Sequence, residues 1–248
     1  MQDKLLGMMK HSINSIVGNG KIGVAFSGGV DSTLVSQVCS EMNYDVTLLT
    51  VGFAGSHDVM FAKKVNDLLQ LPHHTLEINT TTFPDVVKKV GNTINTQNLS
   101  WNENCIAFYY ISQLATRLDI DMVVTANGID ELFCGYDRYR DVFSRGSKAI
   151  LEAMREKLNN EISMMKAVNI VTSEFGVRIV QPLLAQDFAE YAITIPISEK
   201  IHGPDDMMRK HIIRELACRV GVPKISYNKR KKALQYGSKI HKELLKLR

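Results

Sequence analysis

The stretch "VAFSGGVDSTLV", Val24–Val35, places the strongest constraint on how this chain can fold. An apolar run stops at two adjacent glycines, and an aspartate and hydroxyl side chains precede apolar residues at helical spacing. Glycines let a backbone approach a ligand closely, and a helix that begins just after them directs its positive end to the same place. The pattern predicts a phosphate-binding corner between a strand and a helix.

This corner differs from the common P-loop, which needs the spacing G-x-x-x-x-G-K-[ST]. The only similar letters, "GNGK" at Gly18–Lys21, fail that spacing and are better interpreted as a helix-to-strand turn. Ser27, Ser32 and Thr33 can offer hydroxyl donors to a phosphate. The Asp31 carboxylate would repel a bare phosphate, so we expect a magnesium ion between the carboxylate and the phosphate. The predicted ligand is therefore a magnesium nucleotide.

Apolar patterning along the chain predicts alternating strands and helices over the first half. Strands are expected at Ile22–Phe26, Asp45–Val51, His74–Ile78 and Asp121–Ala126, and helices at Asp3–Val17, after Asp31, at Met60–Leu71 and at Cys105–Leu118. Beyond Ser147 the pattern is mostly helical, with one extended piece near "VRIVQPLL". Such alternation indicates an α/β fold with a parallel sheet flanked by helices, in which ligands bind at the carboxyl ends of the strands.

Composition narrows the class of protein. The chain has 248 residues, of which 45% are hydrophobic, so it can bury a sizeable core. Its four cysteines are scattered without a C-x-x-C pair, which argues against a disulfide framework or a zinc knuckle and favours a cytoplasmic location. No apolar run approaches the roughly 20 residues that a membrane span needs. We expect a soluble protein with no membrane partner.

The C-terminal segment is strongly basic. From Lys224 to Arg248 there are nine Lys or Arg residues and one acid, Glu243. Such a tail could meet nucleic acid, bring cations to a phosphate-bearing ligand, or simply be solvated. Composition alone does not choose among these.

Several segments, in order from residue 24 to about residue 240, resemble one family. "SGGVDS" resembles the pyrophosphate-binding loop of the ATP pyrophosphatases, which cleave ATP between the α and β phosphates. The other segments are similar to those of asparagine synthetases: "TVGFAGSHDVMFAKKV", "TANGIDELFCGYDRY", "FGVRIVQPLL" and "NKRKKALQYG". We identify the chain as similar to the synthetase domain of that family, without its glutaminase domain.

The resemblance implies a fold and a reaction. The fold would be a Rossmann-like parallel sheet with flanking helices, in one domain over residues 1–248. Residues 1–145 would form the nucleotide-binding core, and 146–248 a mainly helical extension that completes the site. In the reaction a carboxylate attacks the α-phosphorus of ATP, pyrophosphate leaves, and ammonia or an amine then displaces AMP.

The resemblance also implies site residues. Those expected to bind ATP are Ser27, Gly28, Gly29, Asp31, Ser32, Val51, Gly52 and Gly128. Asp31 and Asp130 are expected to hold Mg²⁺ on the pyrophosphate, and Lys231, which aligns with the lysine of the family's R-x-K element, is expected to stabilise charge during adenylation. Asp130 and Glu131 would also fit the start of a helix. For Lys229, Arg230 and Lys232, a solvated basic segment is the expectation.

Some positions depart from the family pattern. Asparagine synthetases usually begin, after removal of methionine, with a cysteine that hydrolyses glutamine, whereas this chain starts "MQDK". We therefore expect free ammonia or a separate glutaminase subunit as the nitrogen source, and the resemblance leaves room for a homodimer. Asn127 replaces the acidic residue of S-G-[DE]-G. Together with Arg178, Val180 and Ala185 in the next motif, it leaves the acceptor carboxylate open, aspartate included.

Two alternatives keep the nucleotide site but change the function. In one, the enzyme modifies another substrate such as a tRNA base, with the basic tail on RNA phosphates. Relatives that thiolate tRNA tend to carry cysteine pairs, which this chain lacks, so nucleic acid is the less favoured partner. In the other, the protein is a non-catalytic nucleotide-binding module, against which the intact "SGGVDS", Asp130 and Lys231 all argue.

Overall fold

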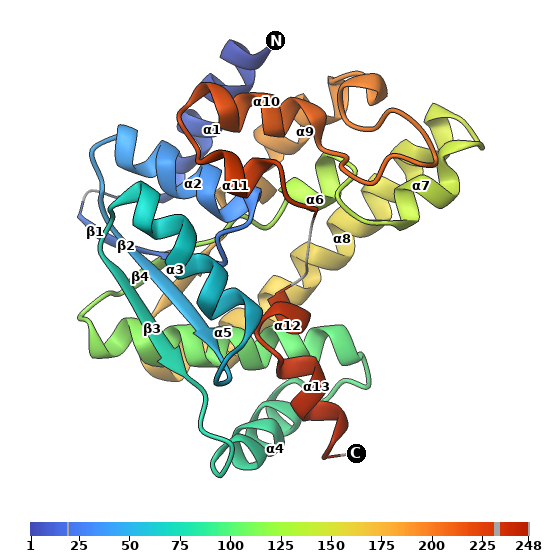
Figure 1. Ribbon diagram of the computed structural model, residues 1–248. Coiled ribbons are helices and arrows are strands. Elements are labelled where there is room, and N and C mark those ends of the chain that lie inside the picture. Colours follow the sequence, from blue (N-terminus) through green and yellow to red (C-terminus); the bar gives the residue numbers. More distant parts are fainter. Residues whose placement is uncertain (19, 231–233, 248) are drawn as a thin grey trace.

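A five-stranded parallel sheet lies between layers of helices in a computed structural model that describes residues 1–18, 20–230 and 234–247 (Figure 1). The strand order is β3-β2-β1-β4-β5, and each pair of neighbours is parallel. The strands are β1 (Lys21–Ala25), β2 (Asp45–Gly52), β3 (His73–Glu77), β4 (Met122–Val124) and β5 (Arg178–Val180). In register, Val24 of β1 lies opposite Leu48 of β2 and Val124 of β4.

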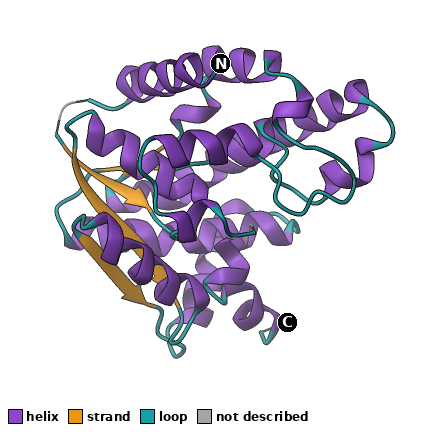
Figure 2. Cartoon of the chain, turned by 45° about the horizontal axis from the view of Figure 1, so that its top comes forward, coloured by secondary structure: helices purple, strands orange, loops and turns teal. Residues whose placement is uncertain are grey.

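Helices cover both faces of this sheet, as Figure 2 shows from a second direction. One face packs against α1 (Gln2–Ile16), α2 (Val30–Glu41), α3 (His57–Leu69), α9 (Gln186–Thr194) and α10 (His211–Arg219), with α11 (Lys224–Tyr227) beside α2 and α10. The other face packs against α4 (Phe83–Ile94), α5 (Leu99–Arg117), α8 (Ser147–Thr172) and α13 (Ile240–Leu245), with α12 (Leu234–Gly237) beside α5. Short helices α6 (Ile129–Leu132) and α7 (Arg138–Phe143) follow β4, and 3₁₀ turns lie at Ser173–Phe175, Pro182–Leu184 and Ile197–Glu199.

Alternation along the strands divides the core into two layers. In β2, Val46 and Leu48 face the α2 side, whereas Leu49 and Val51 face the α5 side. The short strand β4 divides in the same way. Because both faces of the sheet are buried at its centre, β1, β2 and β4 are mostly apolar, as is typical of parallel sheets, whereas the edge strand β3 has only Leu76 buried.

The strand order reverses between β1 and β4. The chain leaves β1 toward β2 on one side and reaches β4 on the other, so the connections diverge at the carboxyl ends of these two strands. A crevice at such a switch point is where ligands bind in open α/β sheets. The "SGGVDS" loop follows β1, and "TANGIDELF" follows β4, so both motifs reach this point.

The structure confirms the predicted fold class. The predicted strands and helices are present with boundary shifts of a few residues, except that α5 begins at Leu99 rather than Cys105. The extended piece near "VRIVQPLL" is β5, which joins the sheet beside β4. Helix α4 was not predicted, since "TTFPDVVKKVGNTI" carries both proline and glycine. Within the described residues, no helix is long and apolar enough to cross a membrane.

Gly128, in the turn after β4, permits a prediction about the fold. Its φ of 109° is accessible to glycine but strained for residues with a side chain. A Cβ at this position would lie 2.5 Å from the carbonyl oxygen of Leu183. We expect Gly128→Ala to lower the free energy of unfolding by about 3 kcal/mol, measured by urea denaturation, because strain and overlap with backbone add.

Gly146→Ala is the matched control. Gly146 also has positive φ, 85°, but a Cβ there would meet nothing within 4 Å. Its substitution should cost about 1 kcal/mol from backbone strain alone. Equal losses for the two variants would show that the contact with Leu183 is unimportant.

Candidate nucleotide site

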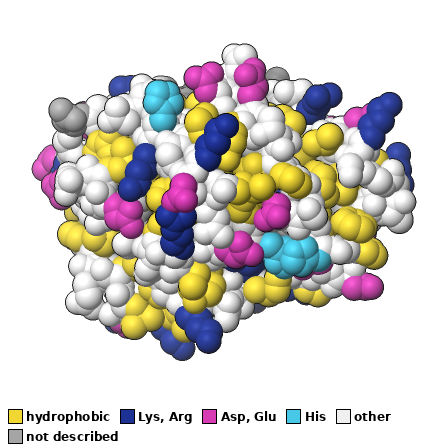
Figure 3. All heavy atoms as spheres, turned by 90° about the horizontal axis from the view of Figure 1, so that it is seen from above, with side chains coloured by type: hydrophobic (Ala, Val, Ile, Leu, Met, Phe, Trp, Pro, Cys, Tyr) yellow, Lys and Arg dark blue, Asp and Glu magenta, His cyan; other side chains and the backbone are white. Residues whose placement is uncertain are grey.

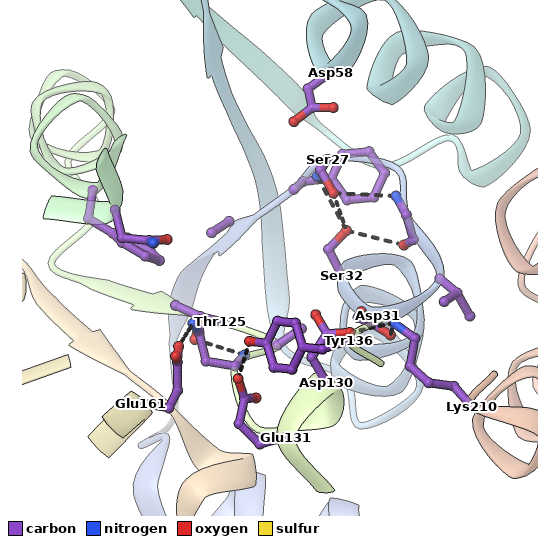
Figure 4. Close-up of a pocket in the computed structure, with 18 of the residues that line it drawn as sticks. Ser27, Asp31, Ser32, Asp58, Thr125, Asp130, Glu131, Tyr136, Glu161 and Lys210 are labelled. Atoms are coloured by element: carbon purple, nitrogen blue, oxygen red, sulfur yellow. Dashed lines mark hydrogen bonds and ion pairs between the residues drawn. The ribbon is translucent and has the colours of Figure 1, made fainter. Parts of the chain in front are cut away.

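A cavity of about 280 Å³ opens at the carboxyl ends of β1 and β4 (Figure 4). Its walls come from the loops after these two strands, from α5 and α8, and from the chain on either side of α10 and α11. Segments from both halves of the sequence therefore complete one site.

The glycine corner after β1 forms the hydroxyl-lined wall of the cavity. Ser32 Oγ accepts a hydrogen bond from the Ser27 N–H at 3.2 Å, and Ser27 Oγ accepts one from the Gly29 N–H at 3.4 Å. Gly29 is the N-cap of the 12-residue helix α2, whose first-turn residues face the cavity. Hydroxyls and a helix N-terminus together favour a bound anion.

Thr33 differs from the expectation that it faces the ligand. It is fully buried, and its hydroxyl donates to the Gly29 carbonyl at 2.8 Å. Ser226 of α11 donates to the Thr33 hydroxyl at 3.0 Å and to the Gly28 carbonyl at 2.7 Å. These two side chains thus fix the corner from behind, because they satisfy its carbonyl groups.

An ammonium group between two carboxylates is the main electrostatic feature of the site. Lys210 Nζ lies 2.6 and 2.9 Å from the two oxygens of Asp31 and 2.9 Å from Asp130 Oδ1 (Figure 4). The lysine side chain is 1% exposed and the carboxylates 20% and 19%. Burial alone would lower the Lys210 pKa, but Asp130 and Asp31 overcome this and hold it above its usual value. Lys210 is therefore positively charged.

The backbone that presents Lys210 is unusual. Arg209 and Lys210 are consecutive residues with left-handed φ, 51° and 54°. Asp206 accepts the N–H groups of Met208 and Arg209 at 3.0 Å each, which supports this turn. Burial acts to raise the Asp206 pKa, but the N–H groups of Arg209 and His202 and the His211 ring hold it well below its usual range. The Asp206 carboxylate is an anchor for the turn.

Arg214 ties the Lys210 turn to the basic segment. It is 7% exposed and donates to the Arg209 carbonyl at 2.7 Å and to the Lys229 carbonyl at 3.0 Å. Lys229 Nζ in turn lies 2.7 Å from His57 Nε2 and 3.3 Å from the centre of the Phe61 ring. The expectation of a purely solvated segment is therefore wrong for Lys229, which lines the cavity together with the more exposed Arg230.

Contacts within the turn after β4 explain why particular residues occur in its motif. Glu131 accepts the Gly128 N–H at 2.9 Å and the Tyr136 hydroxyl, so its carboxylate organises the turn. A Cβ on Gly135 would lie 1.7 Å from Asp130 Oδ1, so the Asp130 position requires glycine there. Burial and the nearby carboxylates raise the Tyr136 pKa well above its usual value, which keeps its hydroxyl a donor.

Asn127 lies on the opposite edge of this turn and meets a carboxylate from α8. Its Nδ2 donates to Glu161 Oε1 at 2.5 Å, and Glu161 is 6% exposed. Both residues line the cavity. Arg178, Val180 and Ala185, the other departures from the family pattern, are not among the described residues that do so.

The structure brings together most of the residues predicted to form the site. Those that line the cavity are Ser27, Gly29, Asp31, Ser32, Val51 and Asp130. Among the described residues, Gly28, Gly52 and Gly128 lie beside the cavity rather than in its lining. They are closely packed, since a Cβ on these glycines would contact α3, Ser56 and Leu183, respectively. Lys231 lies outside the described residues.

Sequence reasoning missed Lys210 and Glu161. Lys210 is one cation among several in "MMRKHIIREL", and Glu161 is one acid in a long amphipathic helix. No local pattern marks either residue, because each acquires its role through contacts with residues that are remote in the sequence.

Comparison with known proteins agrees with the resemblance that the sequence motifs indicate. A family model described as asparagine synthase matches residues 5–172 and 163–248. A putative glutamine-hydrolyzing asparagine synthetase 1 of Methanocaldococcus jannaschii is 27% identical over 274 residues, covering 96% of this chain and 50% of that protein. Asparagine synthetase B of Escherichia coli is 26% identical over 207 residues, covering 78% and 37%. The chain thus spans half or less of the length of these curated relatives.

Among solved structures, NMN synthetase from Francisella tularensis aligns with a TM-score of 0.48 and 17% identity, covering 95% of this chain and 75% of that chain. A structural similarity this low supports no conclusion about function.

The contacts of Lys210 predict a coupled stability effect. Lys210→Met would remove a buried cation that both carboxylates contact, so we expect a loss of about 3 kcal/mol in the free energy of unfolding at pH 7. Adding Asp31→Asn should restore about 1 kcal/mol of this, because one charge is removed. Chemical denaturation of the single and double variants measures the coupling.

Lys10→Met is the control for this cycle. Lys10 pairs with Glu41 at 3.1 Å, but both side chains are about one-third exposed. Its loss should change stability by less than about 0.5 kcal/mol. If Lys210→Met lowered the free energy of unfolding as little as Lys10→Met does, the Lys210 charge would not stabilise the buried cluster.

Proposed function

The chain belongs to the asparagine synthase family, and from this premise we propose that it is an ATP-dependent ligase that adenylates a carboxylate and transfers ammonia or an amine to it. A carboxylate oxygen attacks the α-phosphorus of ATP and pyrophosphate leaves. The amine then attacks the acyl carbon, and AMP leaves. The observation that carries the proposal is the convergence of Asp31, Asp130 and Lys210 beside the hydroxyl-lined corner at the start of α2.

The cavity walls support a nucleotide with its phosphates at this corner. Ser27, Gly29 and Ser32 offer hydroxyl and N–H groups, and Lys229 and Arg230 offer cations. The apolar side chains that line the cavity include Val51, Phe108, Ile111 and Met164, which suit a purine ring. Little covalent chemistry is required of the protein, since phosphoryl transfer depends mainly on positioning and charge.

The side chains present also fit magnesium. Asp31 and Asp130 supply oxygen ligands of the kind that Mg²⁺ prefers, and they already converge on one positive group, Lys210 Nζ. When bound there, Mg²⁺ would neutralise charge on the phosphates. Lys210 would orient both carboxylates and offset their repulsion while the phosphates enter.

The nitrogen source and the acceptor acid are parts of the same proposal. The curated relatives are glutamine-hydrolyzing enzymes, which supports ammonia as the nitrogen donor, either free or delivered by a glutaminase unit. Lys157 of α8 lines the cavity and provides a cation for a second carboxylate of the acceptor. Aspartate is therefore the first acid to test.

No specific observation favours a tRNA substrate. On the face shown in Figure 3, Lys and Arg side chains are interspersed with Asp and Glu rather than gathered in one basic area. Lys229 and Arg230 face the cavity, which suits a phosphate-bearing small molecule.

The proposal predicts the products of ATP cleavage. With ATP, Mg²⁺, ammonium and a panel of carboxylic acids headed by L-aspartate, we expect AMP and pyrophosphate, measured by ion-exchange chromatography. Asp31→Asn and Asp130→Asn should each reduce turnover by about 10- to 100-fold, because each removes one arm of a charge clamp on the phosphates. Formation of ADP and phosphate instead would refute adenylation.

Asp187→Asn is a matched control for Asp31→Asn. Like Asp31, Asp187 is the acid in the first turn of a helix, but α9 directs it to solvent away from the cavity. Its turnover should remain within about twofold of wild type, since a surface charge contributes little.

Lys231 remains a proposal from its place in the "NKRKKALQYG" motif. If its charge acts on the α-phosphate in a largely water-free site, Lys231→Ala should reduce pyrophosphate release about 100-fold, while ATP binding stays within several-fold of wild type. The exposed Lys242 is the control, and Lys242→Ala should be near neutral. Equal and mild effects of both substitutions on turnover would remove Lys231 from the mechanism.

A further inference from the structure

A cluster of side chains that can ligate a metal ion lies just before and at the start of α10. His202, Asp206 and His211 each offer one ligand atom, and these atoms all lie within 4.8 Å of one another. None of the three residues is among the described residues that line the nucleotide cavity. The cluster is therefore a second group of ionisable side chains, separate from the Asp31 and Asp130 pair.

The loop before α10 folds so that its two histidines meet. His202 and Asp206 lie in this loop, and His211 is the first residue of α10. The Asp206 N–H donates to the Gly203 carbonyl at 3.2 Å, and the His211 N–H donates to the Lys200 carbonyl at 3.4 Å. These bonds close the loop, and the two histidine rings stack with their centres 3.5 Å apart and their planes 3° from parallel.

The carboxylate of Asp206 is fixed in place beside these rings. Its Oδ1 accepts the N–H groups of Met208 and Arg209, and its Oδ2 accepts the N–H of His202, each at 3.0 Å. Oδ2 also lies 2.6 Å from His211 Nε2. Backbone hydrogen bonds of this kind orient the carboxylates that ligate metals in proteins. Asp206 thus has the support that a metal ligand requires.

The types of ligand atom indicate which ions would bind. Two imidazoles and one carboxylate suit Zn²⁺ and similar divalent transition-metal ions, which often take water in the remaining position. Mg²⁺ prefers oxygen ligands and suits the Asp31 and Asp130 pair instead. The Asp206 and His211 side chains are 9% and 22% exposed, whereas His202 is exposed. An ion can therefore enter from the His202 side.

We propose that His202, Asp206 and His211 bind one divalent transition-metal ion, with Zn²⁺ as the expected ion. The ion replaces the proton between His211 Nε2 and Asp206 Oδ2, which passes to solvent, because a metal-bound imidazole nitrogen must give up its proton. The exposed ring of His202 turns out of the stack to direct a nitrogen to the ion. This inference is independent of the reaction that the nucleotide site catalyses.

The position of the cluster gives the ion a structural role. Asp206 and His211 flank Arg209 and Lys210, the two consecutive residues with left-handed φ. Arg209 is 2% exposed and donates to the Gly135 carbonyl at 3.2 and 3.3 Å, so the turn is also tied to the segment after α6. Left-handed residues with side chains are strained. An ion that joins both ends of this turn would stabilise the backbone that presents Lys210.

Titration of the tag-free full chain with metal ions tests the proposal. After treatment with EDTA and dialysis, Co²⁺ serves as the spectroscopic probe and Zn²⁺ is titrated by calorimetry. We expect one ion per chain, with visible absorption bands of Co²⁺ that Zn²⁺ abolishes and excess Mg²⁺ does not. His202→Ala should weaken Zn²⁺ binding at least about 100-fold, the upper end of the loss expected for a merely supporting contact. Because His202 is exposed, this variant should fold as wild type does, which circular dichroism checks.

His11→Ala is the matched control, since it removes an exposed histidine of α1 outside the cluster. Its affinity for Zn²⁺ should equal that of wild type. Hydrogen exchange locates the ion: Zn²⁺ should slow exchange of the backbone amides of residues 202–211 in wild type and leave it unchanged in His202→Ala. No binding of Zn²⁺ to wild type, equal affinity of wild type and His202→Ala, or protection confined to the nucleotide cavity would each overturn the proposal.

Discussion

The buried ammonium of Lys210 requires three remote parts of the chain to meet. Asp31 comes from the first turn of α2, Asp130 from the turn after β4, and Lys210 from a left-handed turn before α10. The Lys210 cation offsets the repulsion between the two carboxylates, and the carboxylates offset the cost of burying the lysine. The parallel sheet supplies the geometry, since β1 and β4 are neighbours and end at the same edge. The Arg214 and Asp206 contacts then hold the lysine turn in place.

Sequence patterns predicted the fold where they were local and periodic. The buried strand β1, the glycine corner after it and the apolar stripe of α2 follow one another directly in the chain, so their signals reinforce one another. Helix α4 was missed because proline and glycine in "FPDVVKKVGNTI" weaken a helical signal, although proline is tolerated in the first turn. The strand β5 is only three residues long, and its place beside β4 is fixed by pairing rather than by propensity.

The candidate site was predictable only where a motif carries it. Ser27, Asp31, Ser32 and Asp130 follow strand ends in recognisable letters and do line the cavity. Lys210 and Glu161 are ordinary charged residues on helical segments, and only the tertiary fold turns them toward the same cavity. The glycines of these motifs also have a packing role. Gly28, Gly128 and Gly135 make room for neighbouring backbone and side chains and thereby set the positions of the ligand-facing residues.

Transfer of an oxygen label tests most directly whether this cavity adenylates a carboxylate. The acceptor acid would be supplied with its carboxylate oxygens replaced by ¹⁸O, and the released AMP would be analysed by mass spectrometry. If a carboxylate oxygen attacks the α-phosphorus and later leaves with AMP, each AMP formed during amide synthesis carries one ¹⁸O atom. AMP without label, or label found in inorganic phosphate together with ADP, would contradict the account.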